Sequence, residues 1–462
     1  MTSKAHWSEG LNSAQHEAVS HDRGPVAVLA GPGTGKTRVI THRIARLIER
    51  DGVRPESIAA VTFTVKAAEE MQERLGALIG QSPASRVSVG TFHSLGRRIL
   101  HKWGDTIGVP GLTDLMDSVQ RKRMLREAAR LAIDEGHVPS VLLAGGGIEA
   151  LGERAWAWIE FLRTSAVFAD ESMKLATKWM ELIEERAESG EWDDERIAAE
   201  RTNAEELTAS SAIYTHFERI RLERGLLSFD DYIMLPIRVL RESERARAVI
   251  HDEVRHVVVD EFQDVNGAQL AFLRELSPPR MERDICVVGD DDQAIYGFRG
   301  SDDRAFQHFA EIWQGAEVVT LSENYRSSEA VLATAQRVIA AAHDRFEPEK
   351  EILARRDFDD APSQVEAVHV AGNAEEGVTI AAMILEDLAA NDGRDLARIA
   401  VIGRSHNTVS DIGRAMELEG IPVDFSQTKR FEEDDAVLDV KAWIGLVTGW
   451  PGSWVMRLLV RP

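Results

Sequence analysis

A short glycine-rich run carries the most specific chemistry in this sequence. It lies between an apolar strand-like segment and a helical pattern, and it reads Ala30, Gly31, Pro32, Gly33, Thr34, Gly35, Lys36 and Thr37. This is the pattern of a phosphate-binding loop, with alanine where the strict pattern has glycine. The glycines let backbone N–H groups turn toward phosphate oxygens, and the positive end of the following helix adds to the attraction. We expect Lys36 to contact the β- and γ-phosphates of a nucleotide and Thr37 to hold Mg²⁺.

Two adjacent carboxylates are expected to act together with this loop at one nucleotide site. Asp260 and Glu261 directly follow the valine run 257–259, which has the pattern of a buried strand. Ligands of parallel α/β sheets bind at the carboxyl ends of the strands. We therefore expect Asp260 to hold Mg²⁺ through water and Glu261 to polarise the water that attacks the γ-phosphate.

The elements that must position these residues are strands and helices in alternation. Strand-like apolar runs lie at 26–30, 58–63, 87–91, 256–260 and 284–289. A helix is expected at 36–49, directly after the phosphate loop. Strand–helix–strand alternation predicts a parallel sheet with right-handed crossovers, so the fold class is α/β.

Two regions interrupt or extend this α/β pattern. Residues from about 101 to 225 are helical and charged, without a strand signal, and are expected to form an insertion. A further alternating region predicts a second α/β domain. Its strands are expected at 317–321, 366–370 and 399–403.

Composition narrows the class of protein. The 462 residues are 44% hydrophobic and 28% charged, which is ordinary for a globular chain of several domains. Cys286 is the one cysteine, so an intrachain disulfide and a cysteine-based zinc site are excluded. The start of the chain does not resemble a signal peptide, and no apolar run is long enough to span a membrane. We expect a cytoplasmic, soluble protein. Its net charge of -23 argues against unspecific nucleic-acid binding but permits a local basic groove.

Several further segments follow one another in the order of known family motifs. The sequence resembles the UvrD/Rep/PcrA family of superfamily 1A DNA helicases over nearly its whole length. The matching segments are the Q motif at 11–15, motif Ia at 60–68, motif Ib at 90–94, motif II at 259–264, motif III at 289–300 and motif IV at 323–327.

The resemblance implies that the chain binds ATP with Mg²⁺ as its metal. Gln15 and Arg38 would contact adenine, and Tyr325 would stack on it. Gln293 would sense the γ-phosphate and couple it to the DNA-facing end of motif III. Arg326 would reach the γ-phosphate from the second lobe as an arginine finger.

The resemblance also implies a path for single-stranded DNA. Aromatic rings would stack on its bases, a contact that tolerates any sequence. These rings belong to Phe63, Tyr296 and Phe298. The contacts with phosphate or sugar would come from Thr91, His93 and Arg299. Val65 and His406 stand where the family usually has asparagine, so the DNA contacts of those two positions are not carried over.

The family layout assigns the chain to two RecA-like lobes of a P-loop NTPase. The first lobe would comprise 1–100 and 226–300, with the helical insertion at 101–225, an incomplete second lobe at 301–448 and an unassigned tail at 449–462. Family motifs V and VI have no counterpart that we can place in the sequence. We therefore expect either a fragment or a chain that needs a partner chain to supply the missing part.

The function implied by the resemblance is that of an ATP-dependent DNA helicase or translocase. It would hydrolyse ATP in response to single-stranded DNA, move in the 3′–5′ direction on single-stranded or partially duplex DNA, and serve DNA repair or replication. The alternative is a non-motor module that binds ATP and DNA and needs a partner chain for hydrolysis. An unrelated P-loop enzyme, such as a nucleotide kinase, would not account for motifs Ia, III and IV together.

Overall fold

The computed structural model describes most of the chain. The described residues are 6–109, 114–144, 146–279, 283–297, 300–343, 345–356, 365–391, 395–425 and 435–448. The chain divides into two compact units, Met1–Val365 and Glu366–Pro462. Within the described residues, no helix has the length and apolar character needed to cross a membrane.

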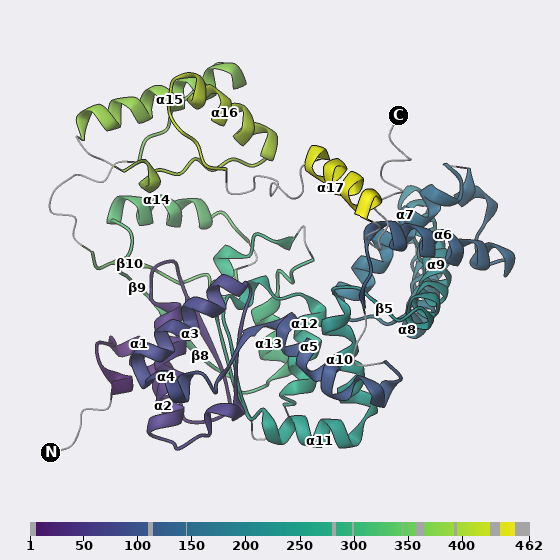
Figure 1. The fold of residues 1–462 in the computed structure, drawn as a ribbon, viewed down its shortest axis with the longest axis horizontal. Helices are drawn as coiled ribbons and strands as arrows, with labels where there is room; N and C mark the ends of the chain where they lie inside the picture. Colours follow the sequence, from purple (N-terminus) through teal and green to yellow (C-terminus); the bar gives the residue numbers. More distant parts are fainter. Residues whose placement is uncertain are drawn as a thin grey trace. The chain divides into compact units, whose positions relative to one another are not determined.

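The first unit, in which Figure 1 labels β8 among the helices that surround it, is built on one sheet. This sheet has six strands in the order β3-β2-β6-β7-β1-β8. Its strands are β1 (Pro25–Ala30), β2 (Ile58–Thr62), β3 (Ser88–Thr91), β6 (His256–Val259), β7 (Asp284–Gly289) and β8 (Glu317–Leu321). Every neighbouring pair of strands runs parallel. The parallel α/β sheet expected from the sequence is therefore confirmed.

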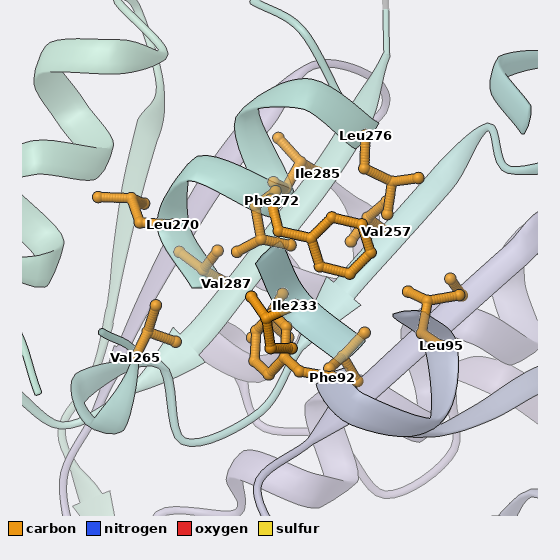
Figure 2. Close-up of a cluster of buried hydrophobic side chains, with 14 of the residues drawn as sticks. Phe92, Leu95, Ile233, Val257, Val265, Leu270, Phe272, Leu276, Ile285 and Val287 are labelled. Atoms are coloured by element: carbon orange, nitrogen blue, oxygen red, sulfur yellow. The ribbon is translucent and has the colours of Figure 1, made fainter. Parts of the chain in front are cut away.

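Alternate residues of each strand enter two different cores, because successive side chains of a strand point to opposite faces of the sheet. In β1, Val26 and Val28 belong to one core, whereas Ala27 and Leu29 belong to the other. Helices α1 (Ser13–Ser20), α2 (Lys36–Glu49) and α3 (Val65–Ile79) contribute to the first core. Helices α5 (Phe92–Trp103), α10 (Asp231–Glu242) and α12 (Gly267–Leu276) contribute to the second, which Figure 2 shows.

The charged region after α5 is largely helical, as its sequence pattern predicted. Its helices are α6 (Ser118–Asp134), α7 (Gly147–Thr164), α8 (Ala169–Glu188) and α9 (Asp194–Glu223). They enclose a core of their own, which includes Trp156 and Phe217. A short parallel pairing of β4 (Asp114–Leu115) with β5 (Leu226–Leu227) joins the start of the insertion to its end.

Shorter elements complete the first unit. In the described residues they are η1 (His6–Ser8), η2 (Pro55–Ser57), α4 (Gln81–Ala84), η3 (Gly104–Ile107), η4 (Ser140–Leu143), α11 (Glu244–Glu253), η5 (Phe262–Asp264), η6 (Asp291–Gln293), α13 (Ala305–Ile312), β9 (Glu323–Asn324), α14 (Glu329–Ile339) and β10 (Leu353–Ala354). Strand β10 pairs with β9, so the segment around 353 lies beside motif IV.

The position of β8 corrects one expectation. We assigned the strand at 317–321 to the second lobe, but it pairs with β1 in the first sheet, Val26 opposite Glu317 and Ala30 opposite Leu321. This pairing satisfies backbone groups on the side of β1 that faces away from β7, which would otherwise be an open sheet edge. His21 also approaches Glu317, with 2.7 Å between Nδ1 and Oε2.

The second unit contains α15 (Asn373–Ala390), α16 (His406–Leu418) and α17 (Asp435–Thr448). Helices α15 and α16 share a small core that includes Ala381, Ile384 and Ile412. The strands expected at 366–370 and 399–403 are absent from the described residues, so these two expectations were wrong. A strand needs a hydrogen-bonded neighbour, and none of the described residues supplies a ladder partner to these segments.

A buried ionic cluster joins the insertion to the first unit's sheet domain. Asp231, at the start of α10, is 1% exposed. It accepts hydrogen bonds from Arg163 of α7 at 2.6 Å and from Arg221 of α9 at 2.5 Å, and also from the backbone N–H of Ser228 at 2.6 Å. Burial alone would raise the pKa of Asp231, but the two arginine charges and the hydrogen bonds outweigh it and lower that pKa. The carboxylate therefore stays ionised and fixes α7, α9 and α10 to one another.

Replacement of Asp231 by asparagine should strongly destabilise the first unit. The change removes the fully buried charge partner of two buried guanidinium groups and leaves them chiefly with Glu218, which is 20% exposed. Breaking a buried ion pair in this way typically costs about 3–5 kcal/mol. The neighbouring Asp230 is much more exposed and lies 3.8 Å from Arg163 Nε, so Asp230→Asn is a matched control with a small expected effect. Urea unfolding of both variants at pH 7 measures the difference.

The same cluster predicts that its contribution to the stability of the folded state depends on pH. Because the folded-state pKa of Asp231 is lowered, its stabilising contribution is complete above the unfolded-state pKa of about 4 and is lost as the pH falls through the folded-state value. The gap between wild type and Asp231→Asn should therefore persist at pH 5 and shrink below about pH 4. A gap that stays constant down to the acid transition would contradict this assignment.

Candidate functional site

The phosphate loop lies between β1 and α2, as the sequence predicted. Gly33 and Gly35 have φ values of 69° and 94°, in the left-handed region that favours glycine. A Cβ atom on Gly33 would also come within 2.5 Å of the Cβ of Arg326. Gly35 caps α2 without any side-chain hydrogen bond, so the first N–H groups of this helix have no side-chain cap. Such a helix start is suited to bind the phosphates of a nucleotide.

A chain of hydrogen bonds connects this loop with the ends of two other strands. Lys36 Nζ lies 2.6 Å from Oε2 of Glu261, which follows β6. Gln263 donates to the same oxygen at 2.9 Å, and its own Oε1 accepts from the backbone N–H of Asp290 at 2.9 Å. The structure thus brings the predicted residues Lys36 and Glu261 into direct contact. We did not expect a role for Gln263. Its amide side chain lies between the carboxylates of motif II in the sequence, and this position is the signal that could have indicated it.

The candidate metal ligands are oxygen groups, as Mg²⁺ prefers. Asp260 is buried at the end of β6, and Thr37 is the second residue of α2. Burial raises the pKa of Asp260 to about 6, and the adjacent charge of Glu261 adds to the rise. The pKa of Asp264 is also raised to about 6, again by burial and by Glu261. A divalent cation would relieve this crowding of carboxylates, so the donor set fits Mg²⁺.

Three residues expected at the adenine base surround the same loop. Gln15 is buried, and its Nε2 donates to the backbone carbonyl of Thr34 at 2.9 Å. Tyr325 is exposed, and its backbone N–H donates to the carbonyl of Gly33 at 3.0 Å. Arg38 is exposed in the first turn of α2. These positions leave the Tyr325 ring and the Arg38 guanidinium accessible to a ligand.

Motif IV is fixed to the phosphate loop by one buried amide. Asn324 donates from Nδ2 to the carbonyl of Pro32. Its Oδ1 accepts from the backbone N–H groups of Arg326 at 2.8 Å and Ser327 at 2.7 Å. The backbone of the expected arginine finger is therefore held against the loop, while the Arg326 side chain is exposed.

Motif III reaches the site through Asp290. Gln293 Nε2 donates to Oδ2 of Asp290 at 2.5 Å. Gln293, the expected γ-phosphate sensor, is thus linked to Glu261 through Asp290 and Gln263. Within the described residues, the structure records no hydrogen bond directly from the Gln293 side chain to the phosphate loop.

Aromatic rings gather beside the carboxyl ends of β2 and β3. The rings of Phe63 and Tyr296 are stacked with centroids 6.2 Å apart. The ring of His93 stacks on Phe229 at 4.0 Å. Phe63, His93 and Phe229 line a pocket of about 220 Å³. Thr91, the N-cap of α5, lies two residues before His93.

Two features of this pocket were not foreseen. Phe229 was not among the residues expected on the DNA path, but it is 58% exposed and its ring is stacked, as a base-binding ring would be. Burial lowers the pKa of His93, against a smaller opposing effect of Asp230, so the imidazole is neutral at pH 7. Phe298 and Arg299, both expected on the DNA path, lie outside the described residues.

The sequence matches known protein families over the segments that contain these motifs. Residues 11–313 match the UvrD/REP helicase N-terminal domain, and residues 319–449 match the UvrD-like helicase C-terminal domain. The ATP-dependent DNA helicase UvrD1 of Mycobacterium tuberculosis is 30% identical over 98% of this chain and 54% of its own length.

Two other relatives show the same relationship. The ATP-dependent DNA helicase PcrA of Leuconostoc citreum is 29% identical over 96% of this chain and 53% of its own length. The putative ATP-dependent DNA helicase YjcD of Bacillus subtilis is 32% identical over 76% of this chain and 41% of its own length. The chain thus spans about half the length of the first two relatives and less of the third. On the combined match of both domain models, the chain belongs to the UvrD/REP helicase family.

Proposed function

We propose that this chain forms the ATP-binding and DNA-binding part of a UvrD-type DNA helicase or translocase. The observation that carries the proposal is the continuous hydrogen-bonded link from Lys36 through Glu261 and Gln263 to Asp290. Motif III, which begins there, also contains Tyr296, whose ring stacks on Phe63. The hydrogen-bonded link from the candidate nucleotide site therefore ends in the same motif that contributes Tyr296 to the aromatic surface.

Residues of the phosphate loop, of motif II and of motif IV each have a separate role in hydrolysis. Bound ATP with Mg²⁺ supplies the phosphoanhydride bond and the charge that polarises it. Thr37 and Asp260 hold the metal, and Lys36 binds the β- and γ-phosphates. When Lys36 turns to the phosphates, Glu261 is released from its ion pair and can orient the attacking water. Arg326 stabilises the charge that develops on the γ-phosphate.

The DNA partner is single-stranded or partially duplex DNA, with bases stacked along the aromatic surface. Stacking on Phe63, Phe229 and Tyr296 tolerates any base, as a translocase requires. Neutral His93 supports the path as a hydrogen-bond donor and stacking partner rather than as a cation. From the family we further propose 3′–5′ movement, a role in DNA repair or replication, and a cytoplasmic location.

The domain limits follow the same reasoning. We propose a first RecA-like lobe from 1–100 and 226–300, to which β8 adds an edge strand, and a helical insertion at 101–225. The incomplete second lobe, expected at 301–448, would comprise the rest of that range, of which residues up to 365 are part of the first compact unit. The non-motor module with a partner chain stays the alternative outcome of the first test below.

ATP hydrolysis by the purified chain, with and without oligo-dT, tests the proposal. Wild type should hydrolyse ATP faster with DNA. Lys36→Ala should lose ATP binding, because the phosphates lose their charge partner. Glu261→Gln should bind ATP but hydrolyse it more slowly by a factor of about 10²–10³, since water is no longer polarised. Equal low rates in all three proteins, with ATP still bound by wild type, would favour the non-motor module.

Removal of the Phe229 ring should weaken binding of oligo-dT. One lost stacking contact is worth about 1–3 kcal/mol, which corresponds to roughly 5- to 150-fold in Kd. Phe229→Trp keeps an aromatic face and is the matched control, with a Kd close to wild type. Fluorescence anisotropy with labelled oligo-dT measures both variants. If Phe229→Ala binds as tightly as wild type, the ring is not on the DNA path.

A further inference from the structure

Three consecutive carboxylates follow β7 and converge on one point. Oxygen atoms of Asp290, Asp291 and Asp292 lie within 4.8 Å of one another. Asp290 is fully buried at the start of motif III. Three like charges at this separation repel one another strongly unless a cation lies between them.

The cation is the ammonium group of a lysine about sixty residues further along the chain. Lys350 Nζ lies 2.7 Å from Oδ1 of Asp290 and 3.0 Å from Oδ2 of Asp292, and it also donates to Asp291. The Lys350 side chain is 1% exposed. Burial alone would lower the pKa of Lys350, but the carboxylates outweigh burial and raise it, so the group stays charged. The ammonium occupies the place that a metal ion would take among these oxygens.

The segment that carries Lys350 makes further contacts with motif III. Arg345 donates from Nε to Oδ1 of Asp292 at 2.7 Å and from Nη2 to Oδ2 at 3.0 Å. The backbone N–H of Phe346 donates to Asp291 at 3.0 Å. Each carboxylate of the run therefore has at least one partner between 345 and 350.

The same segment then passes along the nucleotide site. Ile352 lies so close to the phosphate loop that a Cβ atom on Gly31 would come within 2.5 Å of its Cδ1. Strand β10 pairs Leu353 with Glu323 and Ala354 with Asn324 of motif IV. Residues 345–354, which we call the clamp segment, thus contact motif III, the phosphate loop and motif IV.

Asp290 is the shared residue of the clamp segment and the nucleotide network. Its Oδ1 binds Lys350, its Oδ2 accepts from the amide of Gln293, and its backbone N–H donates to Gln263. A rotation of the Asp290 carboxylate would move the Gln293 amide with it. Because the Lys350 ammonium binds Oδ1 of Asp290, it restrains rotation of the carboxylate. Oδ2 of Asp290 therefore stays in position to accept from the Gln293 amide.

We propose that Lys350 is a positioning residue for Gln293, and that through Asp290 it sets the γ-phosphate sensor of motif III for the hydrolytic step. This inference rests on the proposed ATPase function. The Lys350 ammonium is buried among the three carboxylates of motif III, so its loss should impair the response to bound ATP more than the binding of ATP. Since Tyr296 follows Gln293 by three residues, stimulation by DNA should be impaired as well.

The test compares wild type with Lys350→Met, which keeps the length of the side chain and removes its charge. The kcat with oligo-dT should fall about tenfold or more, because small misplacements of a group at the reacting centre have large effects on rate. The KM for ATP and the Kd of a fluorescent ATP analogue should change by no more than about twofold, the pattern of an interaction that matters only in the transition state.

Gln336→Leu is the matched control. Gln336 Nε2 donates to the carbonyl of Ile352 at 2.8 Å, so this variant loosens the clamp segment without altering the charges at motif III. It should keep a kcat near that of wild type. If both variants lose activity equally, or if Lys350→Met keeps its kcat, Lys350 does not position Gln293.

A second variant covers the case in which Lys350→Met fails to fold. Lys350→Met combined with Asp291→Asn and Asp292→Asn removes the surplus negative charge but leaves Asp290 without its cation. A low kcat with normal ATP affinity in this triple variant supports the proposal. A wild-type kcat would show that Lys350 only neutralises charge, and would overturn it.

Hydrogen exchange of peptides that span 290–297 separates this inference from the proposed function. Exchange should be faster in Lys350→Met, or in the triple variant, than in wild type and Gln336→Leu, whether or not the chain hydrolyses ATP. An inactive wild type with this exchange difference would contradict the proposed function alone. Unchanged exchange together with an unchanged kcat would contradict the role of Lys350 alone.

Discussion

Parallel pairing of six strands determines where the candidate site residues lie. Because every strand runs in the same direction, all carboxyl ends meet at one edge of the sheet. The phosphate loop follows β1, Phe63 follows β2, Asp260 follows β6 and Asp290 follows β7. Lys36 and Glu261 are separated by 225 positions in the sequence, yet their charged atoms are 2.6 Å apart. The candidate nucleotide site and the aromatic residues Phe63 and Tyr296 share this edge, and hydrogen bonds connect the candidate site with motif III, which contains Tyr296.

Local patterns predicted the elements well, but their pairing depends on contacts that no local pattern contains. The helix expected at 36–49 is α2, and the expected strands are β1, β2, β3, β6 and β7. In β1, β2, β6 and β7 burial on both faces produces continuous apolar runs, whereas the edge strand β3 is only half-buried. The apolar run at 317–321 also forms a strand, but its partner β1 lies almost three hundred residues away. At 366–370 and 399–403 the apolar pattern was present without a described ladder partner, and no strand formed.

The candidate site was predictable to the extent that chemistry follows from motif spacing. The loop and the carboxylates after β6 carry such spacing, whereas Phe63 and Tyr296, whose rings are stacked, were expected only from the resemblance to the family. Lys350 was not predictable in this way, because an isolated lysine in a charged segment does not indicate which carboxylates it will meet. Phe229 was missed for a related reason, since only the folded chain places its exposed ring on His93. In both cases the deciding quantity is a distance between remote segments.

Glu261 has a strained backbone conformation and also contacts a residue that is remote in the sequence. Its φ of 49° lies in the left-handed region, which costs a residue with a Cβ roughly 1–2 kcal/mol. The backbone on both sides holds it there, because Asp260 N–H donates to Val61 at 2.8 Å and Asp264 N–H donates to Glu261 at 3.0 Å. In this conformation the Glu261 carboxylate contacts Lys36 and Gln263. The strain is therefore best explained by function, since it points the carboxylate that would orient water at the phosphate loop.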